Sequence, residues 1–283
     1  MLHPIGLPEN LRNLNRTLVM GVLNVTPDSF SDGGRFNDQT IATNHALQMI
    51  EDGADIIDIG GESTRPGSDR ISVQEELDRV LPVISALAGF RAAISIDTMR
   101  AEVARAAIDA GASMVNDVSG GKSDPEMLSY VATLNVPYIL MHWRGPSNIM
   151  NTLTDYNDVV TDVTSEIRNQ VDVAVAAGIA RERIAIDPGI GFAKTVDQNW
   201  PIFTHLSVLE ELGLPILMGA SRKKFLGELL AKDGVARDSD ERESATTAIS
   251  TLMAVRGLWA VRVHNVKASS DAIAVVDRIV KTS

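Results

Sequence analysis

The chain of 283 residues contains no cysteine. Without thiols it can form no disulfide, no thiolate nucleophile and no cysteine-ligated zinc site. Aromatic residues make up only 4% of the sequence, and no apolar run approaches the roughly 18 residues of a membrane-spanning helix. The N-terminal segment lacks the apolar stretch of a signal peptide, so we expect a cytoplasmic protein without a membrane partner.

Positive charge is also in short supply, because the formal net charge is −11. Such an acidic chain is not expected to bind nucleic acid. An anionic ligand would therefore need a local cluster of cationic side chains. The cations that follow predicted strands are Arg65, Arg222, Lys223, Lys224 and Arg262.

Eight short apolar segments, most of them rich in isoleucine and valine, alternate with segments of helical pattern. Continuous apolar runs of this kind are typical of parallel strands that are buried on both faces. The expected strands are 18–25, 54–60, 92–97, 114–118, 136–142, 184–187, 215–219 and 259–264. The expected helices include 40–51, 73–87, 101–109, 158–177, 200–212, 241–255 and 269–280.

Two folds place helices between parallel strands, the closed barrel and the doubly wound open sheet. An open sheet binds ligands at one switch point, using two strand ends. Here nearly every expected strand ends in polar residues, which favours the barrel. No linker divides the chain, so we predict a single (β/α)8 TIM barrel domain over residues 1–283, with residues 1–17 as an N-terminal extension.

The carboxyl ends of the strands in such a barrel meet at one mouth, where the active sites of this fold lie. Carboxylates, amides and cations would converge there, and burying them without a ligand or partners would be costly. The residues at the predicted strand ends are Asn24, Glu62, Ser63, Thr64, Arg65, Asp97, Asn116, Asp117, His142, Asp187, Ser221, Arg222, Lys223, Arg262 and His264.

Seven motifs at these ends carry a family resemblance: NVTPDSFSDGG, GGESTRPG, SIDT, VNDVSGG, DPGIGF, GASRKKF and VRVH, in this order. Together they make the chain, from about residue 18 onwards, resemble the dihydropteroate synthases, a pterin-binding TIM-barrel family. The resemblance implies condensation of 6-hydroxymethyl-7,8-dihydropterin diphosphate with 4-aminobenzoate in folate biosynthesis. It also implies Mg²⁺ as the cofactor and a homodimer.

The resemblance further implies roles for single residues. The pterin is expected at Asp97, Asn116, Asp187 and Lys223, and the diphosphate and metal at Asn24. The catalytic residues are expected to be Asp97, Lys223, Arg262 and His264. The other implied substrate contacts are Phe30, Ser63, Thr64, Arg65, Pro66, Met141, Phe192, Ser221 and Lys224.

The chemistry of four of these residues agrees with their implied roles. A buried carboxylate at Asp97 can accept two neighbouring N–H donors from a pterin edge. Arg262 and His264 lie two apart on one strand, so both can face a departing diphosphate. Mg²⁺ prefers oxygen ligands and keeps waters and phosphates, so a single amide oxygen at Asn24 is a sufficient protein anchor.

Two alternatives remain open from the sequence. One is a methyltetrahydrofolate:corrinoid methyltransferase, which shares the pterin-binding barrel but has no diphosphate to hold. The other is a catalytically silent paralogue that only binds pterin, which would be expected to lose part of the anion-binding residues. The motif ESTRPG together with Arg262 and His264 argues against both.

Overall fold

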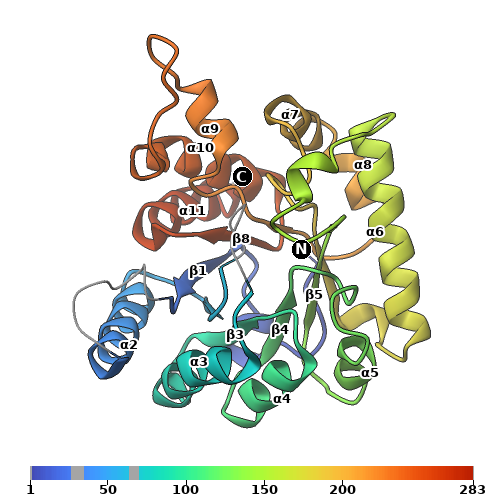
Figure 1. Cartoon of the computed structure of the whole chain (residues 1–283). Helices are drawn as coiled ribbons and strands as arrows, with labels where there is room; N and C mark the ends of the chain where they lie inside the picture. The colour runs from blue at the N-terminus through green and yellow to red at the C-terminus, as the bar shows by residue number, and fades with distance from the viewer. Residues whose placement is uncertain (1, 27–34, 64–69, 283) are drawn as a thin grey trace.

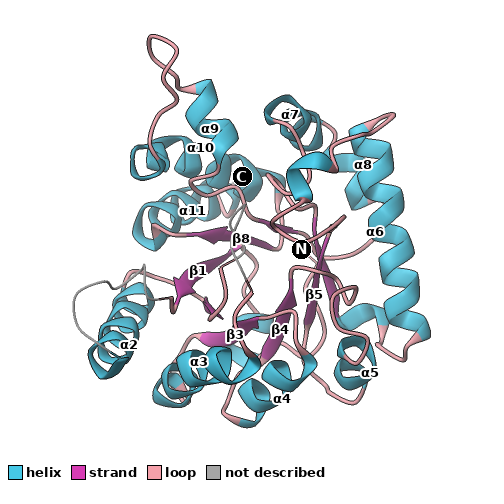
Figure 2. Cartoon of the chain, in the orientation of Figure 1, coloured by secondary structure: helices cyan, strands magenta, loops and turns pink. Residues whose placement is uncertain are grey.

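The computed structural model describes residues 2–26, 35–63 and 70–282. Parallel strands occupy the centre, and helices surround them on the outside (Figure 1, Figure 2). The strands are β1 (Leu18–Asn24), β2 (Ile56–Gly60), β3 (Ala93–Asp97), β4 (Met114–Asp117), β5 (Tyr138–Met141), β6 (Ile184–Asp187), β7 (Leu217–Met218) and β8 (Ala260–Val263).

The strands run in the order β6-β5-β4-β3-β2-β1-β8-β7, and each neighbouring pair is parallel. A parallel bridge between Ile186 and Ile216 joins the two ends of this order. The sheet is therefore closed into a barrel, and the predicted (β/α)8 fold is confirmed.

A short helix precedes the first strand, and the other helices follow strands along the chain and cover the outside of the sheet. Within the part of the chain that the structure describes, none of them is long and apolar enough to cross a membrane. They are α1 (Glu9–Arg12), α2 (Arg35–Glu51), α3 (Val73–Leu87), α4 (Ala101–Asp109), α5 (Met127–Ala132), α6 (Val159–Ala176), α7 (Val196–Thr204), α8 (Leu206–Glu210), α9 (Lys224–Leu229), α10 (Glu243–Arg256) and α11 (Val266–Val280).

Polar side chains begin several of these helices directly after a loop at the barrel mouth. Asp158 accepts a hydrogen bond from the Thr161 amide at the start of α6. Asn265 does the same for α11 with the Ala268 amide, one residue after His264. Such caps satisfy amides that have no partner inside the helix, and they fix where each loop ends.

The two faces of the strands have different surroundings because side chains alternate along a strand. One set packs against the helices, as Ile57, Ile59 and Val261 do. The other set points into the barrel and forms its own apolar cluster near the amino ends of the strands. That inner cluster contains Leu18, Met20, Ile56, Ala93, Met114, Ile139, Ala185, Leu217, Trp259 and Ala260.

The predicted N-terminal extension, described from residue 2 to residue 17, packs against the bottom of the barrel. Leu7 and Leu11 are buried in the inner cluster, where they close its amino end. Arg16 anchors the segment through two hydrogen bonds to Asp55, with N–O distances of 2.7 and 2.8 Å. The bottom of the barrel is thereby sealed, and only the opposite end remains for a ligand.

Candidate active site

The inward-facing positions become polar towards the carboxyl ends of the strands. The register aligns Asn24 with Gly60, Gly60 with Asp97, and Asp97 with Asn116. Polar residues of this inner face are Asn24 on β1, Asp58 on β2, Ser95 and Asp97 on β3, Asn116 on β4, Asp187 on β6 and Arg262 on β8.

Arg262 holds the centre of this polar layer. Its Nε donates to Oδ2 of Asp58 at 2.6 Å, and its Nη2 donates to Oδ2 of Asp97 at 2.8 Å. Burial alone would lower the pKa of Arg262, but the two carboxylates raise it above its usual value. The guanidinium therefore stays charged and links three strands across the barrel mouth.

Asp58 is absent from the predicted site residues, although it is completely buried beside two of them. Its Oδ2 accepts from Arg262 and also from Nδ2 of Asn116, the latter at 2.9 Å. Asp58 lies two residues before the end of β2, so a search for polar strand ends passes over it. The alternation of strand side chains could have identified it, because Asp58 shares its face with Gly60.

Burial shifts the ionisation of the groups that meet here. It raises the pKa of Asp97 to about 7, although the charge of Arg262 opposes that shift. Burial also raises the pKa of Asp187, against the attraction of Lys223. The pKa of Lys223 falls to about 8 because burial disfavours its ammonium, although Asp187 opposes the change. Perturbed groups of opposite sign in one site are a common property of ligand-binding centres.

Lys223 connects the polar layer to an aromatic wall. It immediately precedes α9, its Nζ donates to the carbonyl of Ile190, and the Nζ lies 4.6 Å from the centre of the Phe192 ring. Phe192 in turn lines a pocket of about 440 Å³ that is open to solvent. Other residues around that pocket are Ser63, Trp143, Pro146 and Met150.

His264 and Ser221 form a second polar contact at the mouth. The Oγ of Ser221 lies 2.9 Å from Nδ1 of His264 and accepts from the His264 amide at 3.1 Å. His264 directly follows β8, and Ser221 is buried. These two contacts fix how the loop after β7 meets the end of β8.

Of the remaining predicted site residues, some lie on the barrel strands, one is exposed, and some fall outside the described part of the chain. Asn24 ends β1 on the inner face, and Met141 ends β5 in a buried position. Lys224 is 78% exposed, and its Nζ lies 3.6 Å from Glu228 within α9, so it is not part of the polar layer. Predicted residues outside the described part of the chain are Phe30, Thr64, Arg65 and Pro66.

Three residues at strand ends do not face the mouth, contrary to the expected convergence. Asp117 points outward, because it follows the inward Asn116, and it accepts from the hydroxyl of Tyr138 at 2.8 Å. His142 turns towards α6. Arg222 is ion-paired with Asp240 at 3.1 Å and with Glu243, which neutralises a cation that was expected to attract an anionic ligand.

Comparisons with known proteins agree with this geometry. Residues 20–264 match the family model described as "Pterin binding enzyme". The dihydropteroate synthase of Mycobacterium leprae is 52% identical over 260 residues, which are 91% of this chain and 92% of that protein.

Solved structures extend the similarity to ligand complexes. The Xanthomonas albilineans dihydropteroate synthase with 4-aminobenzoic acid has a TM-score of 0.86 at 43% identity, covering 94% of this chain and 93% of that one. The same enzyme in complex with 7,8-dihydropteroate has a TM-score of 0.86 at 40% identity, covering 98% of each chain.

Proposed function

Because the chain belongs to the pterin-binding enzymes and, among them, to the dihydropteroate synthases, we propose how its barrel mouth carries out that reaction. The enzyme joins 6-hydroxymethyl-7,8-dihydropterin diphosphate to 4-aminobenzoate and releases diphosphate. A C–O bond breaks, a C–N bond forms, and the amine loses a proton. The observation that carries our assignment of roles is the buried cluster in which Arg262 joins Asp58 and Asp97.

The pterin edge is bound by the inner polar layer. Asp97 accepts its amino and ring N–H donors as a pair, Asp187 and Asn116 complete the edge, and Lys223 donates to its carbonyl. Asp58 touches no substrate in this assignment, but it positions Asn116 and Arg262 through one carboxylate oxygen. A site with buried polar groups rejects ligands that leave those groups unpaired, which makes recognition selective.

The diphosphate leaves next to the cations at the end of β8. Arg262 and His264 stabilise the negative charge that develops on the leaving oxygens. We infer that the C–O bond breaks before the amine attacks, because the resulting pterin cation is electrophilic enough for the weakly nucleophilic aminobenzoate. The pocket beside Phe192 is where we place the second substrate, with the Phe192 ring as its aromatic wall.

Diphosphate release, measured with and without 4-aminobenzoate, tests this function. We expect rapid release together with formation of dihydropteroate when both substrates are present. A silent paralogue would bind the pterin and release nothing. A corrinoid methyltransferase would instead transfer a methyl group from methyltetrahydrofolate and ignore aminobenzoate.

Pterin affinity is expected to depend on pH, with an acid limb set by Asp97 and an alkaline limb set by Lys223. Asp97 accepts on both oxygens only when ionised, above its pKa of about 7, and Lys223 donates fully only when protonated, below its pKa of about 8. Affinity should therefore rise as the pH increases through 7 and fall as it increases through 8. Calorimetry with a pterin analogue across the pH range measures both limbs. Lys223→Arg should move the alkaline limb upward because a guanidinium stays charged, and a flat profile would contradict both assignments.

Mg²⁺ is proposed to bind through Asn24. Within the described residues, no group of three or more acidic or histidine side chains could hold a metal ion. A single inward amide oxygen suits Mg²⁺, which completes its shell with water and diphosphate oxygens. Once bound, the ion would neutralise charge on the leaving diphosphate.

Mg²⁺ is accordingly expected to bind the free protein weakly and to bind much more tightly when diphosphate is present. Calorimetric titration of Mg²⁺ with and without diphosphate measures the difference. Asn24→Ala should reduce only the diphosphate-dependent binding. Tight stoichiometric binding of Mg²⁺ to the free protein would mean that other ligands hold the ion.

A homodimer is proposed to form through the outer faces of α10 and α11, which lie side by side (Figure 1). Their exposed apolar side chains include Leu252 and Val255 on α10, and Val275 and Ile279 on α11. Apolar side chains gathered on neighbouring helices mark an interaction surface in many proteins.

The expected cytoplasmic location stays a prediction.

Leu252→Glu is expected to convert the dimer to a monomer, because it introduces a charge into the buried centre of the interface. Light scattering after size-exclusion chromatography measures the mass. Val173→Glu, at a similarly exposed valine on α6, is the matched control and should leave the mass unchanged. A monomeric wild-type protein would rule out the dimer.

A further inference from the structure

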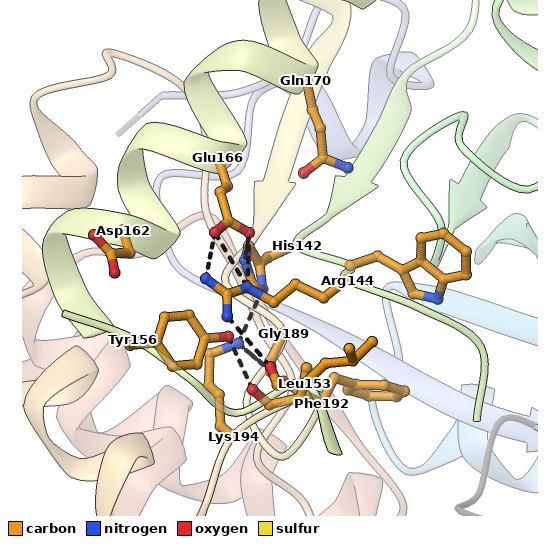
Figure 3. A network of polar contacts seen from close by, with 12 residues as sticks. His142, Arg144, Leu153, Tyr156, Asp162, Glu166, Gln170, Gly189, Phe192 and Lys194 are labelled. Carbon is orange, nitrogen blue, oxygen red and sulfur yellow. Dashed lines mark hydrogen bonds and ion pairs between the residues drawn. The ribbon is translucent and has the colours of Figure 1, made fainter. Parts of the chain in front are cut away.

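A buried polar network lies behind the aromatic pocket, and none of its polar side chains has a role assigned above (Figure 3). Its centre is His142, which follows β5 and is fully buried. Nε2 of His142 lies 2.8 Å from Glu166 on α6, and Nδ1 lies 3.1 Å from Nζ of Lys194. Lys194 is only 7% exposed, so both groups are held away from water.

Lys194 has three acceptors for its three protons. They are Nδ1 of His142, the carbonyl of Gly189 at 3.0 Å and the carbonyl of Phe192 at 3.1 Å. An ammonium can only donate, so Nδ1 of His142 accepts and the ring proton lies on Nε2, facing Glu166. Burial lowers the pKa of His142 to about 4, which keeps the ring neutral as this arrangement requires.

The two charged groups beside His142 are Glu166 and Lys194, and their surroundings shift the pKa of each. Burial alone would raise the pKa of Glu166, but His142 and Arg144 lower it to about 2. Burial and repulsion from Lys223 lower the pKa of Lys194 to about 7, while the carboxylates of Asp187 and Glu166 favour its charged form. Below the pKa of Lys194, the network thus places a carboxylate and an ammonium on opposite sides of one neutral ring.

Arg144 extends the network into the loop after β5. Its Nη2 donates to Glu166 at 2.5 Å, and its Nη1 donates to the Asp155 carbonyl at 2.6 Å. The guanidinium also lies 3.6 Å from the centre of the Tyr156 ring. The loop that carries Trp143 and the pocket residues after it is therefore tied to α6.

The loop after β6 adopts a backbone that needs such support. Gly189, Gly191 and Ala193 all have positive φ, and the value of 47° at Ala193 is unfavourable for a residue with a side chain. Conformations of this kind persist where surrounding contacts over-determine them. The hydroxyl of Tyr156 donates to the Ala193 carbonyl at 2.9 Å, and Lys194 holds the carbonyls of Gly189 and Phe192.

The supported loop faces the active site on its other side. Phe192 forms part of the pocket wall, and the carbonyl of Ile190 accepts from Lys223. A shift of the loop would move the aromatic wall directly. It would disturb the pterin less, because Asp187 belongs to β6 and stays in the sheet, and among the described residues the loop hydrogen-bonds to its side chain only through the Gly189 amide at 2.7 Å.

We propose that Lys194 is a positioning residue for 4-aminobenzoate, and that it fixes the Phe192 ring by holding the loop after β6 against His142 and Glu166. The proposal rests on the assignment of the Phe192 pocket to the second substrate. Lys194 contacts neither substrate in this account. Its effect should therefore appear in the binding of aminobenzoate and much less in the binding of pterin.

Lys194→Met keeps an apolar stem of similar length and removes all three donors. We expect the KM for 4-aminobenzoate to rise at least about tenfold, because small displacements of a binding wall carry large kinetic costs. The Kd of a pterin analogue should change less than about threefold, since the inner polar layer is left intact. Both quantities are measured on the full-length protein, with thermal unfolding as the check on folding.

Tyr156→Phe is the milder second variant, because it removes only the hydrogen bond to the Ala193 carbonyl. Its KM for aminobenzoate should rise about threefold, as expected for one hydrogen bond. Tyr130→Phe is the matched control, since this tyrosine also lies under an arginine but is on α5. It should leave both constants unchanged.

The proposal is overturned if folded Lys194→Met keeps the wild-type KM for aminobenzoate, or if pterin affinity falls as much as aminobenzoate binding. If Lys194→Met does not fold, the Tyr156→Phe result decides: a raised KM supports the proposal and an unchanged KM overturns it. A wild-type protein that makes no dihydropteroate would overturn the proposed function itself, so the two failures are distinguishable.

Discussion

Asp97→Ala is expected to weaken pterin binding at least about 100-fold, which corresponds to about 3 kcal/mol. The carboxylate is the proposed acceptor for two pterin donors, and its loss leaves both unpaired in a buried site. It also removes one of the two carboxylates that hold Arg262, so the cation proposed for the diphosphate loses its position. Calorimetry with a pterin analogue measures the effect on binding.

The barrel itself should survive this substitution, because Arg262 keeps its hydrogen bond to Asp58. Asp109→Ala is the matched control, since this aspartate is exposed at the end of α4. It should bind the analogue like the wild type. Wild-type affinity in a folded Asp97→Ala variant would show that another residue orients the pterin.

Asp58→Ala is expected to reduce kcat/KM at least about 1,000-fold and to lower the free energy of unfolding by about 3 kcal/mol. The side chain is fully buried, and one of its oxygens accepts from both Arg262 and Asn116. Removing it leaves a buried cation with a single carboxylate and an amide with no acceptor. Arg262, the proposed diphosphate contact, and Asn116, the proposed pterin contact, should therefore both lose their fixed positions.

Steady-state kinetics and urea unfolding measure the two effects of Asp58→Ala. Asp58→Asn should fall between alanine and the wild type, because it restores an acceptor oxygen without the charge. Asp172→Ala, at an exposed position on α6, is the control. Unchanged kinetics in folded Asp58→Ala would mean that Arg262 and Asn116 reach their places without this carboxylate.

Much of the fold could be predicted because each buried strand is a continuous apolar run. The expected helices 73–87 and 101–109 coincide with α3 and α4, and the expected strand 184–187 coincides with β6. The strand expected at 215–219 shortens to Leu217–Met218, since an apolar run does not show where the ladder of hydrogen bonds stops.

Other elements required information that periodicity does not contain. The helix expected at 200–212 is two helices, α7 and α8, which are separated at His205. A capping box of Thr195 and Gln198 begins α7 earlier than predicted, and this signal was available in the sequence. The short helices α5 and α9 bury too few apolar residues to form a clear helical pattern.

The candidate site also contains residues that the sequence predicts and residues that it does not. Asp97, Asn116, Asp187, Lys223 and Arg262 could be proposed from the sequence, because they lie at or after the ends of predicted strands and within motifs of the family. The direction in which a side chain turns could not be predicted. His142 and Asp117 are therefore expected at the mouth from the sequence, whereas His142 contacts α6 and Asp117 bonds to Tyr138 on the outer face of the sheet. Asp58 and Lys194 act through other residues, and their importance depends on distances that no spacing reveals.

The most direct test of the account uses pterin diphosphate that carries ¹⁸O in the oxygen bridging carbon and phosphorus. Mass spectrometry follows dihydropteroate and diphosphate after the protein is mixed with this substrate, 4-aminobenzoate and Mg²⁺. We predict equal amounts of the two products, with all of the label in the diphosphate, because the C–O bond breaks. Label retained on the pterin, or diphosphate released without dihydropteroate, would contradict the proposed condensation.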